Sequence, residues 1–536
     1  MEKFDITSKE KEVDDSKQVE ERISKRKLLP RQVSLIGIGG AIGTGLFVSI
    51  GTQLTHGGGA SLLIAFCFWT TVFMGASNSI QELCTFLPVS GSFVHYTERF
   101  VDESCGFAIG WVYYLTQNAN LCFELTAICL VIEFWTSKVP KAVWISVFLI
   151  LYVLLNCFSL FMFGEGEFYL SMGKVILAIG LIIFTIVVMS GGNPEHKVLG
   201  FHNFAHKPFV EYLDTGSMGK FHGFMACLIF ATYVFWGIDY LSLAAQNAID
   251  PRKTMPRSFN KVLARLVIFY IGGALCVGIL LPSDDQTLLD AISEHAGNAA
   301  ASPYTAACVN LKVSVLPHII NALILTSIVS AGNSSLFSAT KALQRLALSG
   351  KAPKIFAYTT RRGVPIYCVG MVLIISLLAY LNVSNGTNKV LTWFLNVETA
   401  GMLIVYIFIC ISYLRYRAGL KAQGFNRDEF IPYKGWGLPF FTWWSLFWFS
   451  LMLLMDGYTV FLKGNWDIQS FVFSYFMIAF FIVLFVGHKI FYRKGFIRAS
   501  EMDFVSDIAE LAEEDEYWRT HGYKLTKFDK AFGKFL

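Results

Sequence analysis

The stretch IGIGGAIGTGLFVSIG, residues 36–51, is apolar enough for the inside of a protein or a membrane, yet six of its sixteen residues are glycine. Glycine is a poor residue for a helix interior because it loses more backbone freedom on folding than any other residue. An apolar run of this composition therefore needs a reason to keep its backbone free. Three structures would supply one, and the rest of the chain distinguishes between them.

The chain around this stretch has the composition of a membrane protein. Of its 536 residues, 54% are hydrophobic and only 15% are charged, whereas about 25% of the residues in an ordinary soluble protein are charged. Apolar runs of the ~20 residues that cross a bilayer recur along the whole chain. They predict twelve transmembrane helices, at residues 33–53, 60–86, 106–133, 142–161, 168–190, 222–247, 261–281, 314–345, 364–382, 391–413, 437–461 and 470–491.

The distribution of charge predicts how these spans are oriented. Basic residues gather in three connections, 251–265, 345–362 and 415–427, each of which follows an even-numbered span. The connection 282–311, after the seventh span, carries four acidic residues and no Lys or Arg. Because Lys and Arg are enriched in cytoplasmic loops, both termini are expected in the cytoplasm.

Of the three structures for the opening stretch, the first is a dinucleotide-binding loop. Gly37 and Gly39 fit its start, but the third glycine is displaced to Gly43 and no strand–turn–helix context surrounds it, so we exclude this structure. The second is close helix packing, because Gly39 and Gly43 form a G-x-x-x-G pair. The third is a helix interrupted in mid-membrane, as in transporters with inverted repeats. Gly43, Thr44 and Gly45 would then supply N–H donors for a carboxylate.

The third structure makes a prediction about a second part of the chain. In two inverted repeats of five helices the first and sixth spans correspond, so the sixth span should be interrupted too. It reads FATYVFWGIDYLSLAA, with Gly237 and Asp239 in its middle. An ionisable group inside a span marks a candidate functional site, although Asp239 could also be a structural carboxylate paired across helices. The two anomalies together favour broken first and sixth helices.

Several further motifs carry a family resemblance. They are GIGGAIGTGLFVSIG in the first span, FLPVSGSFVHYTERFVDES after the second, FGEGEFYLSMGKV opening the fifth, DPRKTMPRS after the sixth, LPHIINALILTSIVSAGNSSLF in the eighth and GKAPKIFAYTTRRGVP after it. Over residues 27–495 the chain resembles fungal plasma-membrane amino-acid permeases, the yeast amino acid transporter branch of the amino acid–polyamine–organocation superfamily. The resemblance implies uptake of amino acids coupled to inward proton movement, with no cofactor besides the coupling protons.

The expected architecture is an all-α polytopic membrane protein with twelve transmembrane helices, built as a 5+5 inverted repeat plus two additional helices. The transporter domain is expected at residues 31–492, with repeat one at about 33–190, repeat two at about 222–413 and helices 11 and 12 at about 437–491. Residues 1–30 and 493–536 are expected to be flexible cytosolic tails. Lysines in these tails could be targets of a ubiquitin ligase and the endocytic machinery.

The resemblance also implies a substrate site between the two broken helices. The segment Ile42 to Gly45 would hold the α-carboxylate of the substrate, Tyr233 would be an aromatic gate, and carbonyl groups from Gly237 to Asp239 would hold the ammonium group. The candidate substrate-binding residues are Ile42, Gly43, Thr44, Gly45, Tyr233, Gly237, Ile238 and Asp239.

Three ionisable residues, Lys174, Glu124 and Asp239, are candidates for proton coupling. Glu124 resembles a third-span glutamate of basic-amino-acid permeases, and Lys174 resembles a fifth-span lysine that acts as a proton-binding cation in relatives. Each has a simpler explanation, because Lys174 could extend to the membrane interface and Glu124 could satisfy a polar neighbour. Small polar residues of the eighth span could complete a cation site with Lys174, or could serve helix packing. They are Asn333, Ser334 and Ser335.

The chain departs from the family pattern at four places. Many fungal members carry glutamate at the positions of Asp239 and Asn247, Asn-Pro in place of Asp250-Pro251, and Gly-Gly-Pro in place of residues 57–59. These departures leave the fold intact but bear on coupling and substrate choice.

Several functions compete for this sequence. The leading hypothesis is a proton-coupled amino-acid permease. Two glutamates or aspartates facing one cavity, Glu124 and Asp239, would suit a cationic substrate, and the loop GGNPEHKVLGFHNF favours the branch linked with polyamine and carnitine uptake and with nutrient sensing. A polyamine or carnitine permease and a nutrient sensor with little flux are therefore the alternatives. An enzyme is disfavoured because the sequence has no nucleophile–base pair, metal-ligand cluster or sizeable soluble domain, and nothing in it supports nucleic-acid binding.

Overall fold

The computed structural model describes residue 26 and residues 28–89, 91–157, 160–293, 302–360, 363–384, 387–493, 495–506 and 508–522. Within these ranges the chain is helical and has no β-strand, apart from one isolated backbone bridge between Leu28 and Ala248. The predicted all-α class is therefore confirmed. Most of the predicted N-terminal tail and the end of the C-terminal tail lie outside the described residues.

Each predicted span contains a helix of the structure. The main helices are α2 (Pro30–Ala41), the π-helix η1 (Gly45–Ser49), α3 (Ile50–Phe86), α5 (Glu103–Ile132), α6 (Lys141–Cys157), α7 (Leu160–Met189), α9 (Gly216–Val234), α10 (Ile238–Ala244), α11 (Pro251–Leu280), α14 (Leu316–Leu348), α15 (Ile366–Ser376), α17 (Thr387–Ala422), α19 (Phe440–Met455) and α20 (Ile468–Tyr492). Nine helical segments of the described chain are long and apolar enough to cross a membrane, and α6 and α19 are shorter apolar helices. Twelve crossings stay a prediction.

The long helix α3 contains the turn between the first and second predicted spans. Gly58 inside it has φ +83° and ψ +166°, which are not helical values. The neighbouring residues form backbone hydrogen bonds with the connection that precedes α9. The N–H of Ala60 donates to the carbonyl of Pro208, and the N–H of Val210 donates to the carbonyl of Gly57. A side chain at position 58 would be strained at this φ and would meet the Pro208 carbonyl at 2.5 Å. The glycine-rich segment 57–59 therefore serves a sharp reversal of the chain.

The helices differ strongly in how deeply they lie in the bundle. In the most apolar part of α5, 89% of the residues are buried within the protein, whereas for α20 the share is 11%. Helix α5 packs against α14 and α17, and α3 packs against α9 and α11. The last two helices pack on the outside of this group, α19 against α17 and α3, and α20 against α17 and α5. Helix α5 is therefore the central wall of the bundle, and its polar residues face other helices.

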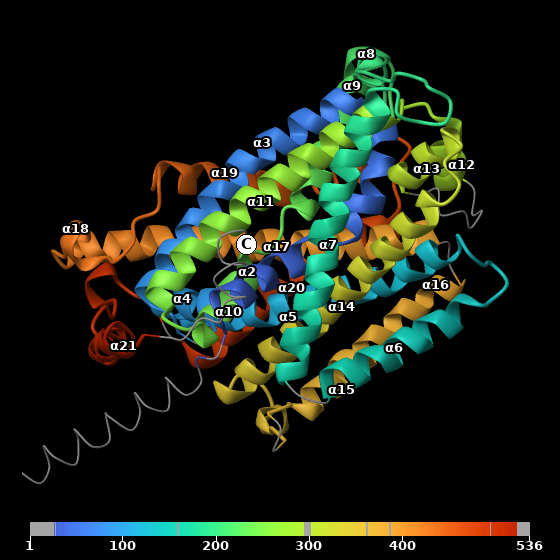
Figure 1. The fold of residues 1–536 in the computed structure, drawn as a ribbon. Coiled ribbons are helices and arrows are strands. Elements are labelled where there is room, and N and C mark those ends of the chain that lie inside the picture. The colour runs from blue at the N-terminus through green and yellow to red at the C-terminus, as the bar shows by residue number, and fades with distance from the viewer. Residues whose placement is uncertain are drawn as a thin grey trace, which may run out of the picture.

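The two ends of the bundle carry different connections. Figure 1 shows α4 (Ser92–Phe100), α18 (Arg427–Phe430) and α21 (Ile508–His521) at one end, and α8 (His202–Ala205), α12 (Gln286–Ser293) and α13 (Pro303–Asn310) at the other. At the first end, Arg26 donates to Glu514 of α21 at 2.8 Å, and Arg99 pairs with Asp503 at 3.1 Å. The residues after 493 were expected to be a flexible tail, but as far as residue 522 those described pack against the bundle, because acidic side chains there meet basic ones on the core.

Candidate functional site

The first span is interrupted where its glycines predict. Helix α2 ends at Ala41, and Ile42 has φ −94° and ψ +113°, which is extended backbone. The chain resumes as a π-helix at Gly45. A π-helix shifts the backbone hydrogen-bond register and is found mainly at functional sites. The interruption therefore leaves the backbone around Gly43 and Thr44 outside regular helical hydrogen bonding.

The sixth span is interrupted at the same depth of the bundle. Helix α9 ends at Val234, and α10 begins at Ile238 after three residues that are not helical. Gly237 has φ +112°, and a Cβ there would lie 2.6 Å from the Cβ of Ala41 in the first span. The break thus covers residues 235–237, slightly earlier than expected, and Asp239 already belongs to the first turn of α10.

A small cavity lies between the two interruptions. The residues that line it include Gly43 and Gly45 of the first span, Asn120 and Glu124 of α5, Tyr233 of α9 and Glu398 of α17. Its volume is about 20 Å³, which is room for about one water molecule. An amino acid enters only if the surrounding side chains move outward, so the structure has a closed site.

Thr44 and Glu124 form the closest polar contact in this cavity wall. The hydroxyl of Thr44 donates to Oε2 of Glu124 at 2.5 Å. Both side chains are buried, with 0% and 2% of their surface exposed. A Cβ at Gly43 would lie 2.6 Å from Oε1 of Glu124. Only glycine at position 43 therefore lets a carboxylate sit directly on the interrupted backbone.

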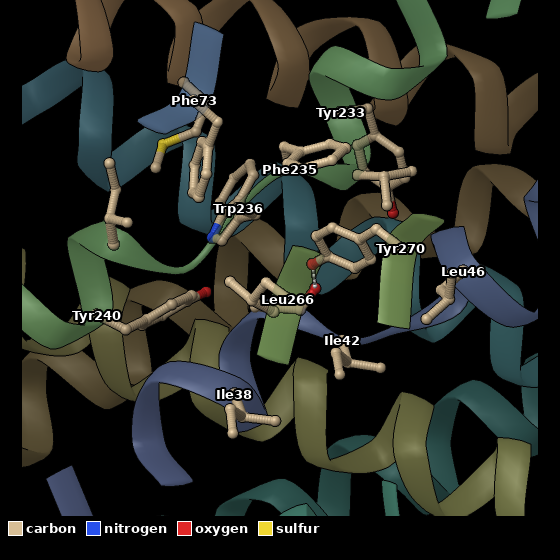
Figure 2. Packing of buried hydrophobic residues seen from close by; sticks show 14 of the residues in the cluster. Ile38, Ile42, Leu46, Phe73, Tyr233, Phe235, Trp236, Tyr240, Leu266 and Tyr270 are labelled. Carbon is tan, nitrogen blue, oxygen red and sulfur yellow. Dashed lines mark hydrogen bonds between the residues drawn. The ribbon is translucent and has the colours of Figure 1, made fainter. Parts of the chain in front are cut away.

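Aromatic side chains of the sixth span close the opposite wall. Figure 2 shows Tyr233, Phe235 and Trp236 gathered across from Ile42 and Leu46 of the first span. The ring of Tyr233 packs edge-on against Phe123, with 5.4 Å between ring centroids, and would lie 2.8 Å from a Cβ at Gly45. Tyr233 therefore lies directly on the resumed first-span helix, at the edge of the cavity.

Asp239 lies behind this aromatic wall. Its carboxylate accepts a hydrogen bond from the hydroxyl of Tyr113 at 2.9 Å and from the N–H of Gly237 at 3.3 Å. It is fully buried and is not among the residues that line the cavity in the described structure. The structure thus places Asp239 beside the break in the sixth span, where it joins the break to α5, while Ile238 is buried next to it.

Lys174 forms a second polar cluster behind the first span. It is 1% exposed, and its ammonium donates to the carbonyl of Gly39, in the last turn of α2. Glu167, two turns earlier on α7, is also buried and accepts from Ser330 at 2.6 Å and from Ser171 at 3.3 Å. Lys174 experiences the charges of both Glu167 and Glu124. It is therefore a buried cation between carboxylates and does not extend to a membrane interface.

The polar residues of the eighth span divide between this cluster and the helix itself. Asn333 donates to Glu167 at 3.4 Å and accepts from Asn156 at 2.7 Å. The hydroxyl of Ser335 donates to the carbonyl of Ala331 within α14, and Ser334 is buried. Of the three candidates, Asn333 is thus the one that the structure joins by a hydrogen bond to the groups around Lys174.

Two buried carboxylates, Glu167 and Glu398, were not singled out in the sequence. Each was visible as an acidic residue inside an apolar span, in GEFYLSMGKV and in LNVETAGMLIV, a pattern that by itself marks a candidate site. What the sequence could not supply is their position in space, because Glu167 contacts α14 and Glu398 faces α5 across the cavity.

Comparisons with known proteins agree with this architecture. A family model for amino acid permeases matches residues 32–500. The chain belongs to the amino acid permease family. The permease is 37% identical over 500 residues to the general amino acid permease AGP2 of Saccharomyces cerevisiae, covering 92% of this chain and 84% of that protein. It is 34% identical over 506 residues to the lysine-specific permease of the same organism, covering 93% and 81%.

A solved structure shows the same fold. The manganese transporter of Eremococcus coleocola aligns with a TM-score of 0.53 over 87% of this permease and 94% of that chain, at 12% sequence identity. At this identity the likeness concerns the fold alone. The permease is therefore an all-helical, multi-pass membrane protein of a transporter family.

Proposed function

We propose that the permease takes up amino acids across the plasma membrane by proton symport, with alternating access to the cavity between its two interrupted spans. The contact between Thr44 and Glu124 supports this most strongly. It brings an ionisable group onto the backbone segment that we assign to the substrate carboxylate. Substrate binding and protonation would then occur at the same place.

Competition for Thr44 would couple the two events. A substrate carboxylate that binds the interrupted first span takes the Thr44 hydroxyl from Glu124, since both anions need the same donor. A displaced carboxylate in a buried site is strongly destabilised unless it gains a partner or a proton. Protonation of Glu124 from an acidic exterior would therefore favour substrate binding, and loss of that proton on the inside would favour release. Each proton that moves inward gains about 2.3 kcal/mol per 100 mV of membrane potential.

Lys174 would link this exchange to movement of the helices. Its ammonium joins α7 to the last turn of α2, next to the interruption. A change in the charge of Glu124 alters the attraction that holds Lys174 in this place. Because the first span and α7 meet there, the same change would alter how the two helices pack. We therefore assign proton coupling to Glu124 and Lys174 together, with Asp239 supporting the sixth-span break.

The orientation that we propose has both termini in the cytoplasm and the bundle embedded in the lipid bilayer. It is supported by the contact of Arg26 with Glu514, which brings the two described ends of the chain to the same end of the bundle. The basic connection after the sixth span lies there as well, because Arg252 pairs with Asp515. Lysines of the two cytosolic tails would be targets of a ubiquitin ligase and the endocytic machinery. The proposed activity is transport without catalysis, and its partners are a small-molecule substrate, protons and lipid.

Radiolabelled uptake at two external pH values tests this function, in fungal cells stripped of their own permeases. The panel contains neutral, acidic and basic amino acids, spermidine and carnitine. We expect one class of amino acid to accumulate, faster at the more acidic pH. Accumulation of spermidine or carnitine alone would contradict the assignment to amino acids. If the protein reaches the cell surface and the cells accumulate none of these compounds, the result would contradict transport and favour a nutrient sensor.

A further inference from the structure

Glu398 brings to the cavity wall a carboxylate oxygen that has no partner in the structure. It lies on α17, is 1% exposed and lines the cavity. Its Oε2 makes no hydrogen bond in the structure. The amide oxygen of Asn120, which lines the same cavity, also has none. Two unpartnered acceptor oxygens thus border the space between the interrupted spans.

Two buried acids away from the cavity, Glu82 and Asp102, show the usual pairing of a structural carboxylate. Glu82 accepts from Arg427 at 2.7 Å, from Tyr413 at 3.2 Å and from the N–H of Gly435 at 2.9 Å. Asp102 pairs with Lys489 and caps α5 through the N–H of Ser104. A buried carboxylate without such partners is costly. Asp456, which follows α19, also has bare oxygens but does not line the cavity. Among these four acids, Glu398 is therefore the one whose free oxygen belongs to a side chain of the cavity wall, where a bound substrate can supply the partner.

The charges around the cavity indicate what that partner is. Glu124 already has the hydroxyl of Thr44 as a donor and the positive charge of Lys174 nearby. Glu398 has no cation within the described part of the protein to compensate it. A zwitterionic amino acid brings no net charge, so it leaves this carboxylate uncompensated. An amino acid with a second ammonium group brings one positive charge and up to three N–H donors for the free oxygens.

We propose that Glu398, together with Asn120, binds the side-chain ammonium of a cationic amino acid and so selects basic over neutral substrates. This inference rests on the proposed function, because it places the substrate carboxylate on the interrupted first span and the side chain toward α17. A primary ammonium fits better than a quaternary one, since the unpartnered atoms are acceptors and a quaternary ammonium has no N–H to donate. Glu398 would thus be a specificity-determining residue.

Competition between lysine and norleucine tests the inference, because norleucine has the same carbon chain without the ammonium group. We expect lysine to be the better substrate of the wild-type permease. In Glu398→Gln the apparent affinity for lysine should fall at least about tenfold, as for the loss of one hydrogen bond to a charged group, while that for norleucine stays unchanged. Asn120→Ala should also lower the apparent affinity for lysine, but by a smaller factor.

Thr399→Val is the matched control, since Thr399 is buried beside Glu398 and its hydroxyl bonds only within α17, to the carbonyl of Leu395. It should leave both affinities unchanged. Equal losses for lysine and norleucine in Glu398→Gln would overturn the proposal and assign Glu398 to the α-ammonium. An altered pH dependence with unchanged selectivity would overturn it and make Glu398 a proton carrier.

The two proposals fail in different ways. A wild-type permease that accumulates neutral amino acids and excludes lysine keeps the proposed function and refutes the cation subsite. A wild-type permease at the cell surface that accumulates no amino acid refutes the proposed function itself. If Glu398→Gln does not reach the surface, the ratio of the lysine and norleucine affinities in Asn120→Ala decides, and a ratio equal to that of the wild type refutes the subsite.

Discussion

At the interruption of the first span the backbone borders the cavity, whereas at the interruption of the sixth span bulky side chains do. The first break combines glycine with the small Thr44, whose hydroxyl donates to the carboxylate of Glu124. The second break is a single turn at Gly237, surrounded by Tyr233 and Trp236. The carboxylate of Asp239, which follows this break, accepts a hydrogen bond from Tyr113. Two corresponding helices are thus broken for different purposes, one to offer backbone groups and the other to shape a wall.

Replacing Gly43 by leucine should have the largest effect on transport. Its Cβ would lie 2.6 Å from Glu124 and 3.2 Å from Ala331, so the side chain fills the place of the substrate carboxylate. An overpacking cost of about 1–3 kcal/mol predicts uptake reduced by roughly fivefold to somewhat more than a hundredfold. Gly180→Leu is the control, because a Cβ at this exposed position of α7 meets nothing within 4 Å. Equal uptake by the two variants at equal surface amounts would remove the first-span break from the site.

Replacing Gly237 by alanine should affect folding before transport. The φ of +112° is strained for any residue with a Cβ, and the Cβ would also lie 2.8 Å from the carbonyl of Gly37. A strained backbone residue costs about 1–3 kcal/mol, so the variant should show a lower melting temperature in detergent and less protein at the cell surface. A variant with wild-type melting temperature would show that the sixth-span turn does not need glycine.

Asp239→Asn and Tyr113→Phe remove the charge and the donor of one buried contact. We expect each to lower uptake by about tenfold while the protein reaches the membrane, in keeping with about 1.5–3 kcal/mol for a hydrogen bond to a charged group. If Asp239 acts through Tyr113, the double variant should be no worse than either single variant. Additive losses would mean that Asp239 contacts substrate or protons by another route. Undiminished uptake in Asp239→Asn would remove this residue from the mechanism.

The smallest effect is expected outside the membrane, at the pair formed by Lys207 and Asp284. The hydrogen bond from the Lys207 ammonium, 2.6 Å away, holds the pKa of Asp284 below its usual value. Its stabilisation is therefore present above the ordinary carboxyl pKa of about 3.9 and is lost as the pH falls through the lowered value. An exposed pair contributes at most about 1 kcal/mol.

Lys207→Met should therefore lower the melting temperature at pH 7 by no more than about 4 °C. The difference from the wild type should shrink toward zero below pH 4. Lys138→Met, at an exposed lysine of another loop, should change neither value. A difference that persists or grows in acid would show that Lys207 stabilises the loop without Asp284.

Much of this architecture follows from local features of the sequence. Long apolar runs predict the helices because a bilayer demands them, and the glycines of 36–51 and Gly237 predict the interruptions because they conflict with helix formation. The sequence left open whether Gly39 and Gly43 serve helix packing or a helix break, and in the structure the two explanations hold together. Gly39 lies against Glu167 and Gly43 against Glu124, so both permit close approach beside a break.

The pairing of buried polar groups could not be predicted in the same way. Three buried hydrogen bonds each join residues at least 80 positions apart in the chain. They are those of Glu124 with Thr44, Asp239 with Tyr113 and Glu167 with Ser330. Only the packing of helices brings them together, and a sequence without its fold contains no such distances. For this reason the sequence favoured Glu124 and Asp239 as two carboxylates in one cavity, whereas the structure lines the cavity with Glu124 and Glu398.

The central claim is that the interrupted first span holds the carboxylate of an amino acid. Its most direct test is equilibrium binding to the purified permease. The ligands are the amino acid that accumulates most in the uptake panel and the amine that remains when its carboxylate is removed. The claim predicts that the amino acid binds at least about tenfold more tightly, the difference expected from one hydrogen bond to a charged group. Equal or tighter binding of the amine would contradict it and would move a polyamine substrate to first place.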